Sequence, residues 1–271
     1  MANELPLGKH VAYSFTYDPS LLCPIPRQLG REAAGIAKQV ASWLGEDIWN
    51  IYELSWLSES GRPEVAMAEL RVPSSSPNLI ESKSFKLYCN SFNMSRFVSG
   101  DTVRKTMEKD LSATAGARVE VVLIEPRDFA KVTINEPEGI CLDEQTIDQV
   151  SFIPDPSILA TGDDTTQQTF FSRLFRSCCP VTGQPDWATV TVSYEGKRIV
   201  PESLLRYLIS YREHAGFHEA CVENIFSDIM KQCRPAELTV TARFTRRGGI
   251  DINPIRSTGT GPWPNLRDPR Q

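Results

Sequence analysis

The same order of secondary-structure signals occurs twice along the chain, and this repetition limits the possible folds more than any other feature of the sequence. In the first half, residues 48–57 are rich in aromatic and β-branched side chains, and a turn sequence separates them from residues 65–72. This pattern predicts a β-hairpin. Residues 81–97 and 101–111 then carry apolar side chains at helical spacing, and residues 118–125 form another β-branched segment. A hairpin, two helices and a strand are therefore expected.

The second half repeats this order. Residues 187–200 predict another hairpin, because Glu195-Gly196 is a two-residue turn of the kind that closes hairpins. Residues 201–211 and 222–230 carry apolar side chains on one helical face, and residues 237–245 again favour a strand. Helices of this kind need a sheet to cover. The expected fold is therefore α+β, with two tandem modules of antiparallel sheet backed by helices.

The module boundaries follow from changes in composition. The connection between the two halves is rich in Asp, Glu, Pro and Thr and has little periodicity, although residues 149–153 favour a short strand. The predicted division is an N-terminal extension at 1–45, a first module at 46–127, the connection at 128–165, a second module at 166–258 and a C-terminal tail at 259–271.

Composition excludes several classes of protein. No apolar run approaches the roughly 20 residues that span a bilayer, and the start of the chain lacks the charged and apolar regions of a signal peptide, so a cytoplasmic protein is expected. The net charge of −5 does not favour the basic surface of a nucleic-acid binder, which leaves a small-molecule substrate. Seven scattered cysteines, an odd number, predict no disulfide framework.

The segment from Cys179 to Trp187 carries the strongest chemical signal. A cysteine and a carboxylate, Asp186, stand at the two ends of a loop that contains Pro180, Gly183 and Pro185. A thiol becomes a strong nucleophile only as a thiolate, and a nearby carboxylic acid can handle the protons that a covalent reaction moves. The pair predicts a covalent enzyme.

Four separated motifs carry a resemblance to a known family. They are ESKSFKLY at residues 81–88, CPVTGQPD at 179–186, FHE at 217–219 and RRGGID at 246–251. Together they resemble the 7-cyano-7-deazaguanine reductases, the NADPH-dependent nitrile reductases of queuosine biosynthesis, in their long two-module form. The resemblance implies the tunnelling fold, in which helix-backed antiparallel sheets assemble into a barrel-like oligomer with active sites where modules meet. It also implies a homodimer.

The resemblance makes Cys179 the nucleophile and Asp186 the proton donor. The thiolate would add to the nitrile carbon of 7-cyano-7-deazaguanine, and two successive hydride transfers from NADPH would take the thioimidate to 7-aminomethyl-7-deazaguanine, before the base enters transfer RNA. Cys178 is the adjacent thiol, but the family motif places the nucleophile immediately before Pro180. Cys178 is therefore assigned to packing.

A guanine-like base presents adjacent N–H donors that a carboxylate can accept in a pair, so a glutamate is the natural anchor. Which of the two candidate glutamates dominates is left open. If Glu81 and Cys179 serve one site, that site must be built across a module or subunit interface. The resemblance implies substrate contacts from Glu81, Ser82, Lys83, His218 and Glu219, and NADPH contacts from Lys83, Ser84, Arg247 and Gly248. No Gly-x-Gly-x-x-Gly sequence opens a helix after a strand, so a Rossmann dehydrogenase is not expected.

Structural alternatives exist for each residue: a buried inert cysteine, an aspartate that braces a turn, solvated glutamates, a half-exposed histidine and a solvated basic turn. Two other functions also compete. One is a zinc-dependent tunnelling-fold hydrolase or cyclohydrolase that acts on a purine or pterin nucleotide, with His214 and His218 on one helical face and a cysteine as ligands. No dense ligand cluster completes such a set, and no metal is predicted. The other is a non-catalytic purine-binding module, in which replacing Cys179 changes nothing.

Overall fold

The structure is a computed structural model that describes residues 14–271. Its strands are β1 (Pro24–Pro26), β2 (Leu44–Leu57), β3 (Pro63–Pro73), β4 (Asn78–Ile80), β5 (Glu120–Ile124), β6 (Ile140–Cys141), β7 (Thr161–Ser172), β8 (Arg176–Cys178), β9 (Pro185–Ile199), β10 (Glu237–Phe244) and β11 (Ile250–Ser257). Its α-helices are α1 (Arg27–Ala33), α2 (Ser82–Ser91), α3 (Gly100–Ala115), α4 (Pro201–Ile209) and α5 (His218–Gln232). Within these residues, none of the helices combines the length and apolar character that a bilayer crossing needs.

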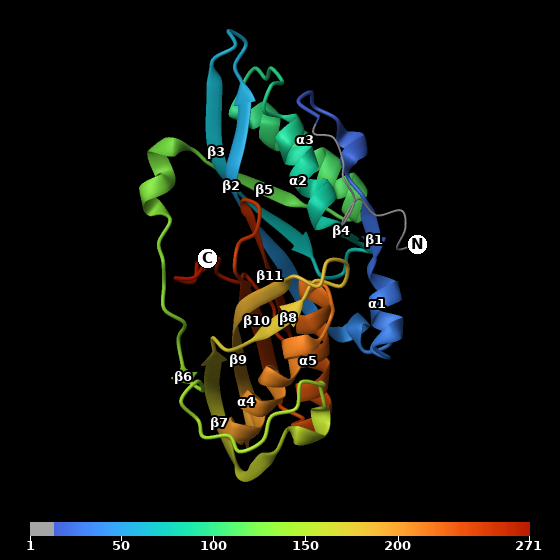
Figure 1. Ribbon diagram of the computed structural model, residues 1–271, viewed down its shortest axis with the longest axis vertical. Helices are drawn as coiled ribbons and strands as arrows, with labels where there is room; N and C mark the ends of the chain where they lie inside the picture. Colours follow the sequence, from blue (N-terminus) through green and yellow to red (C-terminus); the bar gives the residue numbers. More distant parts are fainter. Residues whose placement is uncertain (1–13) are drawn as a thin grey trace. The chain divides into compact units, whose positions relative to one another are not determined.

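The chain folds into two compact units (Figure 1). Of the described residues, unit 1 contains 14–30, Asp47–Thr133 and Arg246–Asp251, and unit 2 contains Arg31–Glu46, Ile134–Thr245 and Ile252–Gln271. The predicted modules are consecutive in sequence, whereas these units are not. Residues 246–251 belong to unit 1 rather than to the second module, and residues 31–46 belong to unit 2. Local composition carries no signal for such an exchange.

Unit 1 contains the predicted first hairpin. Strands β2 and β3 are joined by a tight turn in which the Gly61 N–H donates to the Ser58 carbonyl at 2.9 Å, and β5 pairs antiparallel with β3. A separate antiparallel pair joins β1 to β4. The two predicted helices are present, α3 with its buried positions four residues apart at Val103, Met107 and Leu111. The expected hairpin, helices and strand are therefore confirmed.

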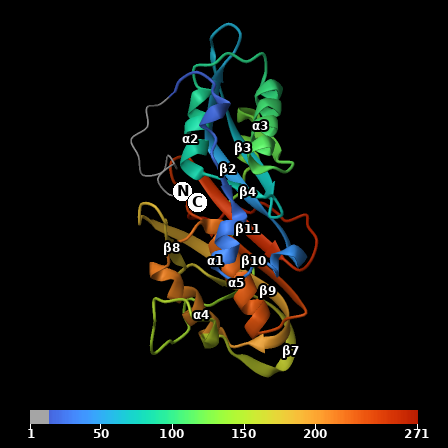
Figure 2. The same cartoon turned by 90° about the vertical axis from the view of Figure 1, so that its right-hand side faces the viewer.

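Unit 2 is built around the antiparallel strands β11, β10, β9 and β7, with the short β6 parallel to β7 and β8 paired with β9. Helices α4 and α5 cover one face of this sheet (Figure 2). Alternate residues of β9 and β10 point into that layer, because successive side chains of a strand face opposite ways. Val190, Val192, Val240 and Phe244 are buried there. The predicted α+β class, with antiparallel sheets backed by helices, is confirmed.

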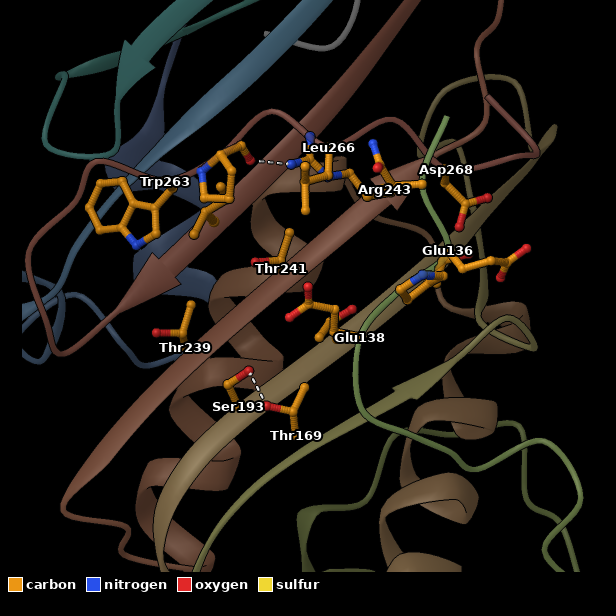
Figure 3. A pocket seen from close by; sticks show the side chains of 16 residues that line it. Glu136, Glu138, Thr169, Ser193, Thr239, Thr241, Arg243, Trp263, Leu266 and Asp268 are labelled. Carbon is orange, nitrogen blue, oxygen red and sulfur yellow. Dashed lines mark hydrogen bonds between the residues drawn. The ribbon is translucent and has the colours of Figure 1, made fainter. Parts of the chain in front are cut away.

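The other face of the unit 2 sheet is lined by hydroxyl side chains (Figure 3). The hydroxyl oxygens of Thr169 and Ser193 are 2.9 Å apart, and those of Thr239 and Ser257 are 2.8 Å apart. Hydrogen bonds between these hydroxyl groups therefore link neighbouring strands. Residues 135–138 and 263–268 help to enclose a pocket of about 250 Å³ on this face. Polar side chains alternate with the apolar core positions of the same strands.

The second hairpin prediction is wrong. Strand β9 continues from Pro185 to Ile199, and Gly196 pairs with Thr166 of β7 instead of forming a turn. A Cβ at Gly196 would lie 2.8 Å from the Cα of Pro235, so the close backbone approach explains the glycine. The partner strand β7 was not predicted, because its sequence TGDDTTQQTFFS is mostly polar. Residues 149–153 form no strand.

Candidate active site

A hairpin loop presents Cys179. The loop joins β8 to β9, and it is closed by two backbone hydrogen bonds, from the Cys179 N–H to the Gln184 carbonyl at 2.8 Å and from the Gly183 N–H to the Cys179 carbonyl at 3.0 Å. Gly183 has a φ of 68°, which an L-residue adopts only with strain. The glycine and prolines of the motif thus hold the thiol in a fixed turn.

Cys179 and Asp186 lie on the same face of this hairpin. Ser177 is directly opposite Asp186 and Cys178 opposite Pro185, and the Cys179–Gln184 bond extends this ladder by one residue. Side chains two residues apart share a face, as do residues directly opposite. The thiol and the carboxylate are therefore diagonal neighbours, whose Cα atoms are typically about 7–8 Å apart. Both are buried, with 3% of Cys179 and 7% of Asp186 exposed.

His218 reaches Asp186 because the segment before α5 pairs with β8. The Cys178 N–H donates to the His214 carbonyl at 2.8 Å, and the Gly216 N–H donates to the Cys178 carbonyl at 3.0 Å. This pairing sets the start of α5, so that Nε2 of His218 lies 3.3 Å from Oδ2 of Asp186. The imidazole also stacks on Phe244, with ring centroids 3.9 Å apart and an interplanar angle of 12°. Its Nδ1 is buried and has no hydrogen-bond partner among the described residues.

Glu219 completes the set of predicted site residues in unit 2. It lies in the first turn of α5 and is 5% exposed. The position favours a negative charge, because backbone N–H groups and the helix dipole are positive at this end. The pKa of the neighbouring Cys221 thiol is raised to about 12, first by burial and then by the charges of Asp186 and Glu219. The Cys221 thiol therefore stays protonated at neutral pH.

Cys178 is oriented differently from its neighbour. Its thiol donates to the Arg212 carbonyl and accepts a hydrogen bond from Arg176, both at 3.7 Å. The guanidinium groups of Arg176 and Arg212 each lie over the ring of Trp187, at 5.7 and 5.3 Å from its centroid. These contacts fit the packing role assigned to Cys178.

In unit 1, Glu81 caps helix α2. Its carboxylate accepts the N–H groups of Lys83 at 2.8 Å and Ser84 at 2.6 Å, and only 1% of the residue is exposed. The alternative of a solvated helix glutamate is therefore wrong. Ser84 is fully buried, and its hydroxyl donates to the Glu81 carbonyl and accepts the Cys23 N–H. Ser82 and Lys83 are half-buried in the first turn of the helix.

The basic loop at residues 246–249 lies against the same helix. A Cβ on Gly248, which has a φ of 65°, would lie 3.1 Å from Cε of Lys86. The loop is held on β2: the Arg246 guanidinium lies 4.8 Å from the ring centroid of Tyr52, and the Tyr52 N–H donates to the Gly249 carbonyl at 2.9 Å. The structure thus brings Gly248 together with α2, although the two are distant in sequence.

The loop is anchored further by Asp251. Its carboxylate accepts hydrogen bonds from Asn50 at 2.8 Å and from the Tyr52 hydroxyl at 2.5 Å. The predicted site residues therefore form two groups, one in each unit. Unit 2 holds Cys179, Asp186, His218 and Glu219, and unit 1 holds Glu81, Ser82, Lys83, Ser84, Arg247 and Gly248.

The paired-histidine arrangement of the zinc alternative is wrong. His214 lies before α5 in extended backbone, with φ −68° and ψ 124°, so it does not share a helical face with His218. Burial lowers the pKa of His214. Among residues 14–271, no group of three or more His, Cys, Asp and Glu side chains is arranged to hold a metal ion.

Two residues that contact the predicted site residues were not predicted from the sequence. Phe244 supplies the ring under His218, but in the sequence it is only the last apolar residue of a strand. Lys86 lies beside Gly248, and the one available signal was its spacing of three residues from Lys83, which places both cations on one side of α2. Neither role can be inferred without the long-range contacts.

Comparison with known proteins gives matches over most of the chain. A family model described as nitrile reductase, 7-cyano-7-deazaguanine-reductase N-term, matches residues 13–123, and a model described as QueF-like protein matches residues 185–262. A protein from Desulfotalea psychrophila named NADPH-dependent 7-cyano-7-deazaguanine reductase is 51% identical over 98% of this chain and 97% of its own length.

Proteins of the same name from Burkholderia ambifaria and Burkholderia multivorans are also 51% identical, over 98% of both chains in each case. A crystal structure of the archaeosine synthase QueF-Like in the apo form shares 19% identity and a TM-score of 0.31, and covers 37% of this chain and 99% of its own. Only the sequence relatives bear on function, because the structural likeness is too slight.

Proposed function

The chain belongs to the 7-cyano-7-deazaguanine reductase family, and we propose how its residues carry out the reaction. The enzyme is an NADPH-dependent oxidoreductase that converts the nitrile of 7-cyano-7-deazaguanine to the primary amine of 7-aminomethyl-7-deazaguanine. Reduction of the nitrile to the amine takes up four electrons and four protons. Two hydrides from two NADPH and two further protons supply them. The arrangement of Cys179, Asp186 and His218 in unit 2 carries the mechanistic proposal.

Cys179 is the proposed nucleophile. Its Sγ bonds to the nitrile carbon, one C–N π bond breaks, and the nitrogen takes a proton, which gives a thioimidate. The S–C bond breaks again before the amine is complete, so the thiol is regenerated. Burial of Cys179 in a closed hairpin loop supports this role, because bulk water is kept from the reactive sulfur and the intermediate.

Asp186 is the proposed proton donor to the nitrile nitrogen. It shares a face of the hairpin with Cys179, which is the placement that a group protonating the adjacent atom of the nitrile needs. His218 lies 3.3 Å from its carboxylate and is proposed to orient it and to pass protons during the later steps. The stacked Phe244 ring limits the imidazole to one plane.

Glu219 is the glutamate that we propose as the main anchor of the base. It is buried next to His218 in the unit that holds the nucleophile, whereas the Glu81 carboxylate already accepts two backbone N–H groups. Glu81, Ser82 and Lys83 remain proposed substrate contacts. A carboxylate can accept the ring N–H and the exocyclic amine together, which would hold the nitrile in register with the thiol.

Lys83, Arg247 and Gly248 are the proposed NADPH contacts, and Lys86 joins them. The residues fit an anion: the side chains of Lys83, Lys86 and Arg247 are cationic, and the left-handed Gly248 leaves open the space that a Cβ would fill. Ser84 fits less well, because its hydroxyl is buried and engaged at the cap of α2. When bound, NADPH supplies hydride to the carbon of the nitrile group.

Intact-mass measurement tests the covalent step. The protein is incubated with 7-cyano-7-deazaguanine without NADPH, beside Cys179→Ala and the matched variant Cys178→Ala. A mass increase of one substrate in the wild type and in Cys178→Ala, and none in Cys179→Ala, is expected. If substrate demonstrably binds and no adduct appears, the thioimidate proposal is wrong.

We also propose a cytoplasmic location and a homodimer. The pathway assignment supports the first, because the product base is used to modify transfer RNA. Light scattering of the purified protein tests the second, and a monomer that turns over substrate at full rate would contradict it.

A further inference from the structure

Strands β10 and β11 separate at the end that carries Phe244. Their ladder covers Thr239–Thr241 and Ile255–Ser257, and the next residue of β11, Pro254, has no N–H to donate. Beyond this point the carbonyl of Phe244 and the side chain of Asn253 face a third segment rather than each other.

That third segment contributes Gln271, which is 6% exposed. Its Nε2 donates to the Phe244 carbonyl at 2.8 Å and to Oδ1 of Asn253 at 2.6 Å, and its Oε1 accepts the Asp268 N–H at 2.9 Å. Both amide hydrogens and the amide oxygen are therefore used. One side chain bridges the two strands where their own hydrogen bonds end.

The bridge leads directly to the proposed catalytic pair. The Phe244 ring stacks on His218 and packs edge-on against Phe175, at 6.0 Å between centroids. His218 in turn lies 3.3 Å from Asp186. We propose that Gln271 is a positioning residue, which fixes the Phe244 backbone and through the ring sets the imidazole of His218 against Asp186. This inference rests on the proposed roles of Asp186 and His218.

Attachment of the tail itself does not depend on the Gln271 side chain. Arg243 donates to Oδ1 of Asn265 at 2.9 Å and to the Pro264 carbonyl at 2.7 Å, and Figure 3 shows the second of these bonds. Arg270 is exposed and donates to Thr189 at 3.4 Å. What the amide of Gln271 adds is the link between Phe244 and Asn253.

The test compares Gln271→Ala and Gln271→Glu with Arg270→Ala, a neighbouring tail variant whose exposed side chain hydrogen-bonds to Thr189. The chain has three histidines, so ¹³C-labelled histidine gives three ring resonances, and His218→Asn identifies the one of interest. A ring stacked on Phe244 is shifted by its ring current. We expect the His218 resonance to move in both Gln271 variants and to stay in Arg270→Ala.

Steady-state kinetics give the second readout. Because small misplacements of reacting groups are costly, kcat is expected to fall by about tenfold or more in both Gln271 variants, with a smaller change in KM for 7-cyano-7-deazaguanine. The glutamate variant keeps the volume but cannot donate, so it separates hydrogen bonding from packing.

Three results would overturn the inference: an unmoved His218 resonance in folded variants, a moved resonance with unchanged kcat, or failure of both variants to fold, which would assign Gln271 to the fold alone. A wild-type protein that does not reduce the nitrile would instead remove the proposed function. The resonance comparison would still test the link from Gln271 to His218.

Discussion

His218 and Asp186 come from distant parts of the sequence, yet Nε2 of the imidazole lies 3.3 Å from Oδ2 of the carboxylate. The contact is set by backbone pairing of residues 214–216 with Cys178 and by stacking on Phe244, so the protein's own packing holds the two groups in place. Such preorganisation is what a proton-transfer group needs, because no reorganisation is then required during the reaction.

Replacing Asp186 with Asn keeps the shape of the side chain and removes the acid. We expect kcat to fall by about 10²–10⁴-fold, the usual contribution of a positioned proton donor. The measurement is NADPH oxidation with 7-cyano-7-deazaguanine as substrate. Asp228→Asn is the matched control, because Asp228 is another partly buried acid of unit 2 that accepts a bond from Tyr207 at 2.6 Å. Equal rates in the two variants would remove Asp186 from the mechanism.

Cys221 is expected to be chemically inert despite its position near the site. It is fully buried, and its pKa is raised to about 12, first by burial, so it is a thiol at neutral pH. Cys221→Ala should therefore still form the substrate adduct and lose only about 1 kcal/mol of unfolding free energy from the small cavity. Intact mass and denaturant unfolding measure the two effects. If this variant formed no adduct although Cys179 is intact, Cys221 rather than Cys179 would be the nucleophile.

The half-buried His214 predicts a decline of stability in mild acid. Burial lowers its pKa below the model-peptide value of about 6.5, so below that pH the unfolded chain binds more protons than the folded protein. The unfolding free energy contributed by this group therefore falls as pH drops from about 6.5 toward the lower folded pKa. His214→Gln should flatten this part of the curve in denaturant titrations at a series of pH values. An unchanged slope would contradict the assignment to His214.

The two glutamates should differ when each is changed to Gln. Glu219→Gln is expected to weaken substrate binding by about 10–100-fold, the loss of a charged hydrogen bond of roughly 1.5–3 kcal/mol, with little change in the stability of α5. Glu81→Gln should also lower stability, by about 1 kcal/mol, because the residue caps α2. Calorimetry of substrate binding and thermal unfolding separate the effects.

Ser99→Ala provides the control for capping alone, since Ser99 caps α3 by accepting the Thr102 N–H at 3.2 Å. It should lose stability and keep its affinity for the base. If Glu81→Gln behaves in the same way, Glu81 is a structural residue only.

Gly248→Ala is expected to raise KM for NADPH without preventing the substrate adduct. The left-handed backbone would cost about 1–2 kcal/mol, and the new Cβ would press on Lys86. Gly35→Ala is matched, because Gly35 has a φ of 67° and nothing within 4 Å of its added Cβ. A similar KM in both variants would indicate that the basic loop does not hold the cofactor.

The amphipathic elements and the Cys179 to Asp186 loop could be predicted from the sequence alone. Side-chain periodicity is a local property, so the pattern of apolar residues predicts the first hairpin and helices α2 to α5. The glycine and prolines of the loop likewise restrict the backbone at their own positions. The polar strand β7 was missed, and Gly196 was taken for a turn, because there the deciding contacts are with β9 and with Pro235.

Tertiary structure alone decided which segments meet. It places residues 246–251 in unit 1 beside α2, sets His218 against Asp186, and brings Gln271 to the end of β10. These relationships join residues far apart in the sequence, and they arise from close packing and from the need of buried polar groups for partners. Neither requirement can be read from the residues that are adjacent in sequence. Only the folded protein therefore shows which distant residues pack together and which buried polar groups pair.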